Sequence, residues 1–209
     1  MINLVNITKS FNGNKIIDDI SIKMSKGKVY GFVGRNGSGK TVLLKMITGF
    51  IRPDSGYIEI NNQRLGKDID FPANCGVLIE NPGFISNKTG YENLKLLADI
   101  NKTIDYDKIK NMMIDYELDP NDKKKVKQYS LGMKQKLGLI QAFMEEPEII
   151  ILDEPMNALD DTYVNKVRDY IKSIKHERLI IITSHNQEDI EILCDEVFCL
   201  KNGKLNKIK

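Results

Sequence analysis

The sequence predicts an α/β fold in which helices cover a mainly parallel sheet, and three observations support this. A glycine-rich loop at residues 34–41 stands between an apolar run at 29–33, typical of a buried strand, and a helix-like run at 42–47. Two further runs, at 149–152 and 179–182, are apolar at every position, as expected of strands buried on both faces of a parallel sheet. Helix patterns lie between the glycine-rich loop and the run at 149–152.

Length and composition limit what the chain can be. Its 209 residues fit one domain, 1–209, and two full domains would be cramped. The formal charge of +2, with 29% charged residues, gives no large field of one sign, so we expect no nucleic acid as a main partner. The three cysteines form no C-x-x-C pair, and no apolar run approaches the ~18 to 20 residues that span a bilayer. We therefore expect a cytoplasmic protein without a signal peptide.

The N-terminal segment predicts an antiparallel β part. Strand patterns near 2–7 and 20–24 are separated by Asn12-Gly13, a dipeptide typical of tight hairpin turns. Phe11 comes directly before this turn. An aromatic ring at this place can stack on a nucleotide base or can be an ordinary packing residue, and the pattern leaves both interpretations open.

The glycine-rich loop matches the pattern G-x-x-x-x-G-K-[ST]. Its backbone N–H groups can converge on the phosphates of a nucleotide, and the start of the following helix adds positive potential. Lys40 can reach the β- and γ-phosphates, and the Thr41 hydroxyl can bind Mg²⁺. An ordinary glycine-rich turn is disfavoured by the flanking strand and helix. The predicted phosphate-binding residues are Gly34, Asn36, Gly37, Ser38, Gly39, Lys40 and Thr41.

Helix-breaking residues, strand patterns and helix patterns follow the glycine-rich loop and its helix, in that order. Residues 49–56 are rich in Gly, Pro and Asp and end the helix, and strand patterns at 57–61 and 76–79 come next, with a loop at 80–83. Three amphipathic helix patterns then follow. We expect them to form a helical subdomain, approximately 85–146, that is inserted into the α/β chain and is available to contact another protein.

The apolar run at 149–152 ends in two carboxylates, Asp153 and Glu154. Ligands of parallel sheets gather at the carboxyl ends of the strands, so both acids are expected beside the phosphate-binding loop. There Asp153 can hold Mg²⁺, usually through water, and Glu154 can polarise a water for attack on the γ-phosphate. The alternative, two acids that only begin a loop, is disfavoured by the complete phosphate-binding loop.

The run at 179–184 ends at His185. If this strand neighbours the strand at 149–152, His185 lies at the same sheet edge and can hydrogen-bond the γ-phosphate or the attacking water. A structural histidine is the alternative, and the residues alone do not decide between the two. The other histidine, His176, is expected at the surface.

Ser130 opens the last of the three helix patterns. It is a good N-cap, and the first free N–H groups of a helix form an anion site. Taken locally, the stretch at 130–135 can be no more than a capped helix.

Over essentially its whole length the chain resembles the nucleotide-binding subunit of an ABC transporter, and the order of the motifs is more specific than any one of them. The matches are the aromatic A-loop position at Phe11, Walker A at 34–41, the signature motif at 130–135, Walker B at 149–153, the catalytic carboxylate at Glu154, the D-loop at 157–160 and the switch histidine at His185. The S-x-G-M-K-Q form of the signature, together with residues 78–84, is similar to the bacitracin and lantibiotic resistance branch.

This resemblance implies a P-loop NTPase with a RecA-like core, an antiparallel β-subdomain and an inserted helical subdomain. It also implies a head-to-tail dimer in which each ATP lies between Walker A of one subunit and the signature helix of the other, so that Ser130 and Gly132 join the site. The implied activity is transport-coupled ATP hydrolysis with Mg²⁺. It would power a separate membrane permease, contacted through the helical subdomain at the inner face of the membrane, for export of antimicrobial peptides or drugs.

Two positions depart from the pattern of the family. Many members carry Gln where this chain has Glu80. We hypothesise that Glu80 reaches Mg²⁺ in the closed state, the dimer that ATP holds together, because a carboxylate is a strong ligand for hard cations. A tolerated substitution is the alternative. In the signature, Leu131 and Met133 replace the commoner Gly and Gln, while Ser130 and Gly132 remain.

Other classes of function share part of these motifs. A soluble ABC ATPase without a membrane partner can serve as a scaffold-loading or DNA-handling motor. A P-loop kinase or GTPase shares the first motif, but the signature stretch argues against both. The stretch at 87–90 lacks the Asp of a guanine-recognition motif.

Overall fold

The computed structural model describes residues 1–80 and 83–209. Asn81 and Pro82, which belong to the loop expected at 80–83, lie outside the described residues. The described part contains a six-stranded sheet of order β10-β9-β3-β8-β7-β6, in which β10 is antiparallel to β9 and the other neighbours are parallel. Its strands are β3 (Lys28–Val33), β6 (Cys75–Leu78), β7 (Ile149–Asp153), β8 (Leu179–Thr183), β9 (Glu196–Lys201) and β10 (Lys204–Lys207). The strands predicted at 149–152 and 179–182 are therefore neighbours.

The expected antiparallel part is a second sheet of order β2-β1-β4-β5. It consists of β1 (Ile2–Phe11), β2 (Asn14–Met24), β4 (Ser55–Ile60) and β5 (Gln63–Arg64). Asn12 and Gly13 both have positive φ, 48° and 78°, as a type I′ hairpin turn requires, which confirms the predicted hairpin. Both strands are longer than predicted, because β-bulges let the pairing continue through their polar residues.

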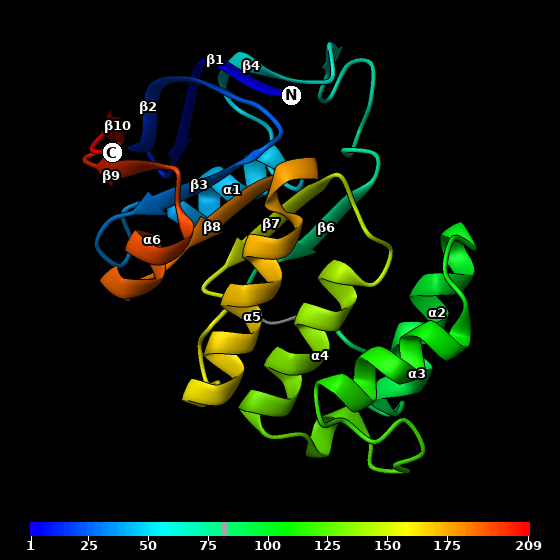
Figure 1. Cartoon of the computed structure of the whole chain (residues 1–209). Coiled ribbons are helices and arrows are strands. Elements are labelled where there is room, and N and C mark those ends of the chain that lie inside the picture. Colours follow the sequence, from blue (N-terminus) through cyan, green and yellow to red (C-terminus); the bar gives the residue numbers. More distant parts are fainter. Residues whose placement is uncertain (81–82) are drawn as a thin grey trace.

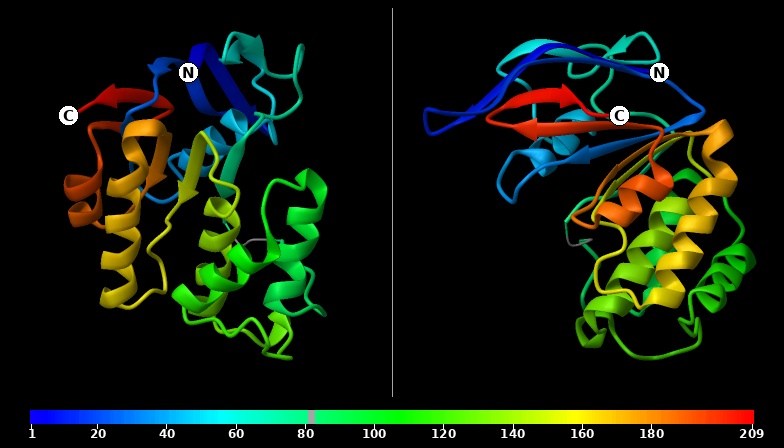
Figure 2. Two further views of the ribbon diagram at one scale, coloured as in Figure 1. Left: turned by 45° about the vertical axis from the view of Figure 1, so that its right-hand side comes forward. Right: turned by 60° about the vertical axis from the view of Figure 1, so that its left-hand side comes forward.

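Helices cover both faces of the six-stranded sheet (Figures 1 and 2). The helices are α1 (Lys40–Ile47), α2 (Gly90–Asn101), α3 (Tyr106–Asp115), α4 (Leu131–Phe143), α5 (Asp161–Ile174) and α6 (Gln187–Leu193). Helix α1 lies between the two sheets, α4, α5 and α6 lie on the opposite face, and α2 and α3 lie beside α4. Neither α5 nor α6 was expected from the sequence patterns, nor were the two short 3₁₀ helices, Val126–Gln128 and Lys175–Glu177.

The six-stranded sheet separates two hydrophobic cores. Successive side chains of a strand point to opposite faces, so Ile149 and Ile151 of β7 pack with α1 and the antiparallel sheet. Ile150 and Leu152 pack with the helices on the other face. The same alternation holds in β8. This explains why these strands are apolar at every position.

The carboxyl ends of β3, β7 and β8 meet at one edge of the sheet, because these strands are parallel and β8 lies between the other two. The glycine-rich loop follows β3, Glu154 follows β7, and Ser184 and His185 follow β8. Topology alone therefore brings these motifs together.

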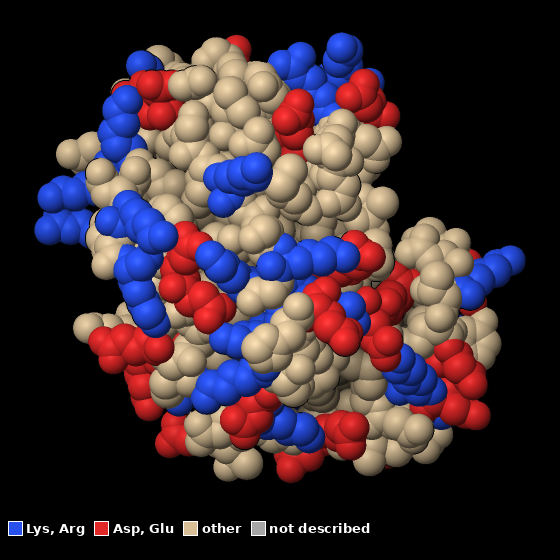
Figure 3. All heavy atoms as spheres, turned by 45° about the horizontal axis from the view of Figure 1, so that its top comes forward, with Lys and Arg blue, Asp and Glu red and all other residues tan. Residues whose placement is uncertain are grey.

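The surface carries charges of both signs, and the cysteines are not paired with one another. Lys and Arg alternate with Asp and Glu over the face that Figure 3 shows. Cys75, Cys194 and Cys199 are free thiols, and burial raises the pKa of Cys75 and of Cys194 to about 12 in each case. His176 is exposed, as predicted. Among the residues that the structure describes, no helix combines the length and the apolar character needed to cross a bilayer.

Candidate functional site

The glycine-rich loop passes so close to neighbouring backbone that side chains would not fit. A Cβ at Gly34 would lie 2.5 Å from the carbonyl oxygen of Leu200. Gly39 has a φ of +104°, which favours glycine, and a Cβ there would lie 2.9 Å from Cγ2 of Ile16. Both glycines are thus required by the path of the loop between β3 and α1.

Lys40 and Ser38 of the loop are set up for an anionic ligand. The Lys40 side chain is only 7% exposed, and its Nζ donates to the carbonyl oxygens of Gly34 at 2.8 Å and Arg35 at 3.4 Å. The ammonium group is therefore folded over the loop. The Ser38 hydroxyl is buried and has no hydrogen-bond partner among the described residues. A buried polar group normally has a partner, so this hydroxyl fits a phosphate oxygen.

Asp153 is held by two hydroxyl groups at the carboxyl edge of the sheet. Thr41, in the first turn of α1, donates to its Oδ2 at 2.7 Å, and Thr183, its neighbour across β7 and β8, donates to its Oδ1 at 2.5 Å. The carboxylate and the Thr41 hydroxyl supply the oxygen ligands that Mg²⁺ prefers. The structure therefore brings together two of the three predicted metal ligands.

Glu154 and His185 face each other at the ends of β7 and β8. The backbone N–H of His185 donates to Oε2 of Glu154 at 3.1 Å, and its ring Nε2 lies 3.0 Å from Oε1, without the alignment of a hydrogen bond. Burial raises the pKa of the Glu154 carboxyl. Glu154 also has a φ of +51°, a strained conformation for a residue with a side chain and one that is frequent at functional sites.

Two further side chains fix the backbone of Glu154. Gln135 of α4 donates from Nε2 to the carbonyl oxygens of Glu154 at 3.1 Å and Pro155 at 2.9 Å. The Thr183 hydroxyl accepts from the N–H of Glu154 at 2.9 Å. The sequence analysis gave neither residue a role, although Gln135 ends the signature motif at 130–135. For Thr183 a signal exists, since it is a polar residue at the end of an apolar strand, directly before Ser184 and His185.

A cavity of about 350 Å³ joins these groups to the β1–β2 hairpin. It is lined by Phe11, Ile16, Asn36, Gly37, Gly39, Lys40, Thr41, Val42, Asp153, Glu154 and His185. The Phe11 ring is 42% exposed, with Nζ of Lys9 5.5 Å from its centroid. A ring this exposed is not a core residue, so the structure favours the interpretation of Phe11 as a stacking surface.

Glu80, the third predicted metal ligand, is not among the residues that line this cavity. Its Oε1 lies 2.9 Å from Nζ of Lys45 on α1, and its side chain is mostly exposed. The residue lies two positions after Leu78, the last residue of β6, and has a φ of +54°. In this conformation Glu80 therefore forms an ion pair with Lys45.

The start of α4 is also separate from the cavity. Ser130 is exposed and caps the helix, its hydroxyl accepting from the N–H of Met133 at 3.2 Å. Gly132 lies against the loop at 157–160, because a Cβ at Gly132 would be 2.8 Å from the carbonyl oxygen of Ala158. Neither Ser130 nor Gly132 lines the cavity. Both are at the surface of this chain, where a neighbouring molecule can reach them.

Comparison of the sequence with protein families finds a match to the ABC transporter family model over residues 17–157. Three relatives illustrate the similarity. The chain is 41% identical to the uncharacterized ABC transporter ATP-binding protein YybJ of Bacillus subtilis (98% of this chain, 94% of the relative). It is 38% identical to the bacitracin transport ATP-binding protein BcrA of Bacillus licheniformis (98% and 68%) and 33% identical to the lantibiotic transport ATP-binding protein SrtF of Streptococcus pyogenes (98% and 89%).

Comparison with solved structures finds the same fold. The dimeric structure of MJ0796, a bacterial ABC transporter cassette, superposes with a TM-score of 0.86 at 22% identity and covers 100% of this chain and 99% of its own. A dimeric post-hydrolysis state of MJ0796 bound to ADP and Pi superposes with a TM-score of 0.87 at 20% identity, with the same coverage. The predicted α/β fold with two sheets and additional helices is therefore confirmed.

Proposed function

Because the chain belongs to the ABC transporter family, as an ATP-binding and ATP-hydrolysing subunit, we propose that it powers a separate membrane permease that exports antimicrobial peptides. The similarity to the bacitracin and lantibiotic transport proteins supports this class of cargo. The same relatives favour transport over the alternative of a scaffold-loading or DNA-handling motor. The observation that carries the ATPase assignment is the meeting of the glycine-rich loop, Asp153, Glu154 and His185 at one sheet edge.

ATP would lie in the cavity between the hairpin and the glycine-rich loop. The exposed ring of Phe11 offers a surface on which the adenine can stack. Lys40 would exchange its two carbonyl partners for the β- and γ-phosphates, which are stronger acceptors because they are charged. The unpartnered hydroxyl of Ser38 and the backbone N–H groups of the loop would donate to the remaining phosphate oxygens.

The ligands for Mg²⁺ would be Thr41 and Asp153, which already lie within hydrogen-bond distance of each other. The bound ion neutralises charge that develops on the phosphates. Glu80 would join them in the closed state only if its ion pair with Lys45 opens. The Lys45–Glu80 pair would therefore break as the closed state forms.

Hydrolysis would be carried out by Glu154 and His185. A carboxyl group with a raised pKa is a better proton acceptor than an ordinary glutamate, so Glu154 suits the role of general base for the attacking water. His185 is fixed to Glu154 through its backbone N–H, which leaves its ring free to hydrogen-bond the γ-phosphate or that water. Gln135 and Thr183 hold the backbone of Glu154 in place from both sides.

A second subunit would complete the site. Ser130 and Gly132 lie outside the cavity of their own chain and at its surface, so the free N–H groups at the start of α4 are available to the γ-phosphate of a partner. This supports a head-to-tail dimer, the assembly that would place two ATP molecules between opposing subunits. The dimeric state of MJ0796 is consistent with such an arrangement for a chain of this fold.

The permease would dock on the helical subdomain, which would place this subunit at the cytoplasmic face of the membrane. Apolar side chains of Leu96 and Ile100 on α2 and Ile114 on α3 are exposed there. A groove of about 620 Å³ runs between residues 72–76, where β6 begins, and the C-terminal ends of α2 and α4. A group of exposed apolar side chains is typical of a surface that binds a protein.

Purification of the chain together with its membrane permease tests this function. We expect the complex to hydrolyse ATP and the rate to rise when bacitracin or a lantibiotic is added. Glu154→Gln in the same complex is the matched control for background hydrolysis. A complex that hydrolyses ATP at the rate of the Glu154→Gln complex, with or without peptide, would contradict the proposal.

A further inference from the structure

A buried ion pair joins the two helices that follow the catalytic strands. Arg168 of α5 and Asp189 of α6 are 6% and 1% exposed. The guanidinium group donates to Oδ1 of Asp189 from Nε at 3.0 Å and from Nη2 at 2.6 Å. Its Nη2 also donates to Oε2 of Glu188, which is largely exposed, at 3.0 Å. Breaking such a buried pair leaves an uncompensated charge, so the pair fixes the distance between the two helices.

The second oxygen of Asp189 is bound to the residue before His185. The hydroxyl of Ser184 donates to Oδ2 of Asp189 at 2.9 Å and accepts from the N–H of Asn186 at 3.0 Å. One hydroxyl thus connects both neighbours of His185 and ties them to Asp189. Ser184 is itself 7% exposed, so water does not compete freely for these bonds.

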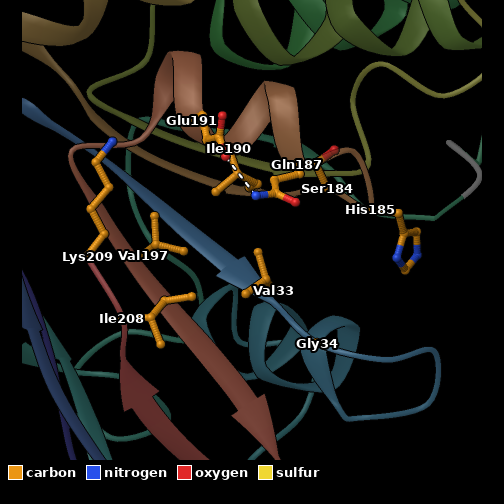
Figure 4. Close-up of a pocket in the computed structure, with 10 residues that line it drawn as sticks. All are labelled: Val33, Gly34, Ser184, His185, Gln187, Ile190, Glu191, Val197, Ile208 and Lys209. Carbon is orange, nitrogen blue, oxygen red and sulfur yellow. Dashed lines mark hydrogen bonds between the residues drawn. The ribbon is translucent and has the colours of Figure 1, made fainter.

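The position of His185 is therefore fixed from two sides. On one side its N–H is bound to Glu154, and on the other its neighbours are bound through Asp189 to Arg168. Figure 4 shows Ser184 at the start of α6, while the ring of His185 points away from the α6 side chains. These bonds restrain the backbone at 184–186, from which the ring of His185 projects.

We propose that Ser184, Asp189 and Arg168 are positioning residues that hold His185 in the orientation required for ATP hydrolysis. This inference rests on the proposed role of His185 at the γ-phosphate. Helix α5 begins directly after the loop at 157–160, which lies against Gly132. Through Arg168 the orientation of His185 is thus tied to the helix that follows this loop.

Steady-state kinetics of ATP hydrolysis by the complex with its permease test this proposal. We expect Ser184→Ala and Asp189→Asn to lower kcat by about 10-fold to 100-fold, because a misplacement near 1 Å has an effect of this size, while the KM for ATP stays within about twofold. Ser184→Thr keeps the hydroxyl and should keep most of the activity. Its additional methyl group has space, because Ser184 lines a cavity of about 400 Å³ between β3, α6 and β9 (Figure 4).

Glu188→Gln is the matched control, because it removes the exposed partner of Arg168 and leaves Asp189 in place. We expect its kcat and melting temperature to equal those of the parent. If Glu188→Gln lowers kcat as much as Asp189→Asn does, the buried pair has no special part and the proposal is wrong.

The His185→Ala background separates positioning from a general loss of structure. There, Ser184→Ala should cause no further fall in kcat beyond about twofold, because the residue that it positions is absent. An equal fall in both backgrounds would overturn the positioning role while leaving the ATPase function intact. If His185→Ala itself leaves kcat unchanged, the proposed role of His185 is wrong and the positioning role is wrong with it. Thermal melting of each variant identifies any that fail to fold, and Asp189→Asn and Ser184→Ala provide independent tests.

Discussion

The backbone N–H of His185 donates to Oε2 of Glu154 at 3.1 Å, across the ends of two neighbouring parallel strands. This bond joins the residue proposed as general base to the residue proposed to contact the γ-phosphate. It also uses one oxygen of the carboxylate, while the other, Oε1, is buried and lies 3.0 Å from Nε2 of His185 without a hydrogen bond.

Glu154→Gln should bind ATP but lower kcat at least about 100-fold, because general-base catalysis contributes at least this factor and an amide cannot accept the proton. The variant should also form a nucleotide-dependent dimer that survives size-exclusion chromatography in ATP and Mg²⁺. Normal hydrolysis by the variant would exclude Glu154 as the base. Absence of any ATP-dependent dimer, with and without the permease, would count against the head-to-tail arrangement.

The stability of the ligand-free fold should depend on pH through Glu154. Burial raises the pKa of this carboxyl in the folded chain above its unfolded value, so the folded state favours the protonated form, and stability is lost as pH rises through the folded pKa. Glu154→Gln should therefore melt at a higher temperature than the parent at pH 8. The difference should shrink as pH falls below about 4.3, the usual glutamate value.

Glu148→Gln is the control for that measurement, because the sign is opposite. The hydrogen bond from Lys26 lowers the pKa of the Glu148 carboxyl, so its charge is not unfavourable in the fold. Its replacement should not raise the melting temperature at pH 8. If both variants are stabilised equally, burial of Glu154 is not the cause.

Phe11→Ala should raise the Kd for ATP by about tenfold, since stacking of a base on an aromatic ring contributes roughly 1–3 kcal/mol. Phe11→Tyr should bind as the parent does. Phe50 is more exposed than Phe11 and lies outside the cavity, so Phe50→Ala is a control for the loss of an exposed aromatic ring. Titration with a fluorescent nucleotide measures the Kd of all three variants. An unchanged Kd for Phe11→Ala would show that this ring is a packing residue and does not stack on the base.

Glu80→Gln tests whether this carboxylate reaches Mg²⁺. We expect the variant to need a higher Mg²⁺ concentration for half-maximal hydrolysis, because a neutral amide is a weaker ligand than a carboxylate. Lys45→Gln removes the partner of Glu80 in the present conformation and should shift the requirement in the opposite direction. An Mg²⁺ dependence that is the same in Glu80→Gln as in the parent would show that Glu80 does not reach the ion.

Short motifs and strand patterns were sufficient to predict much of this molecule. The Asn12-Gly13 hairpin and the position of Asp153 at a strand end follow from local rules, because a turn type needs particular residues and parallel sheets present ligands at one edge. The neighbouring positions of β7 and β8 then brought His185 to Glu154 as the sequence suggested it would.

The residues that support the site were not predictable in the same way. Gln135 lies 19 positions from Glu154 in the sequence. Arg168 lies 21 positions from Asp189, and these two residues are on helices that no pattern had indicated. Each contact depends on how helices pack on the sheet, and a polar residue on a helix has no local signal for the partner that it will meet. The pairing of Glu80 with Lys45 likewise depends on the packing of α1.

The uniform isoleucines of β7 have a consequence for how this strand finds its place. Ile149, Ile150 and Ile151 would bury equally well if the strand slipped by one residue, because both faces of the sheet are covered by hydrophobic cores. Hydrophobicity therefore cannot choose the alignment. Asp153 can determine the alignment, since only one register lets its carboxylate accept hydrogen bonds from the hydroxyl groups of Thr41 and Thr183. The carboxylate proposed to hold the metal is thus also the group that specifies the register of β7.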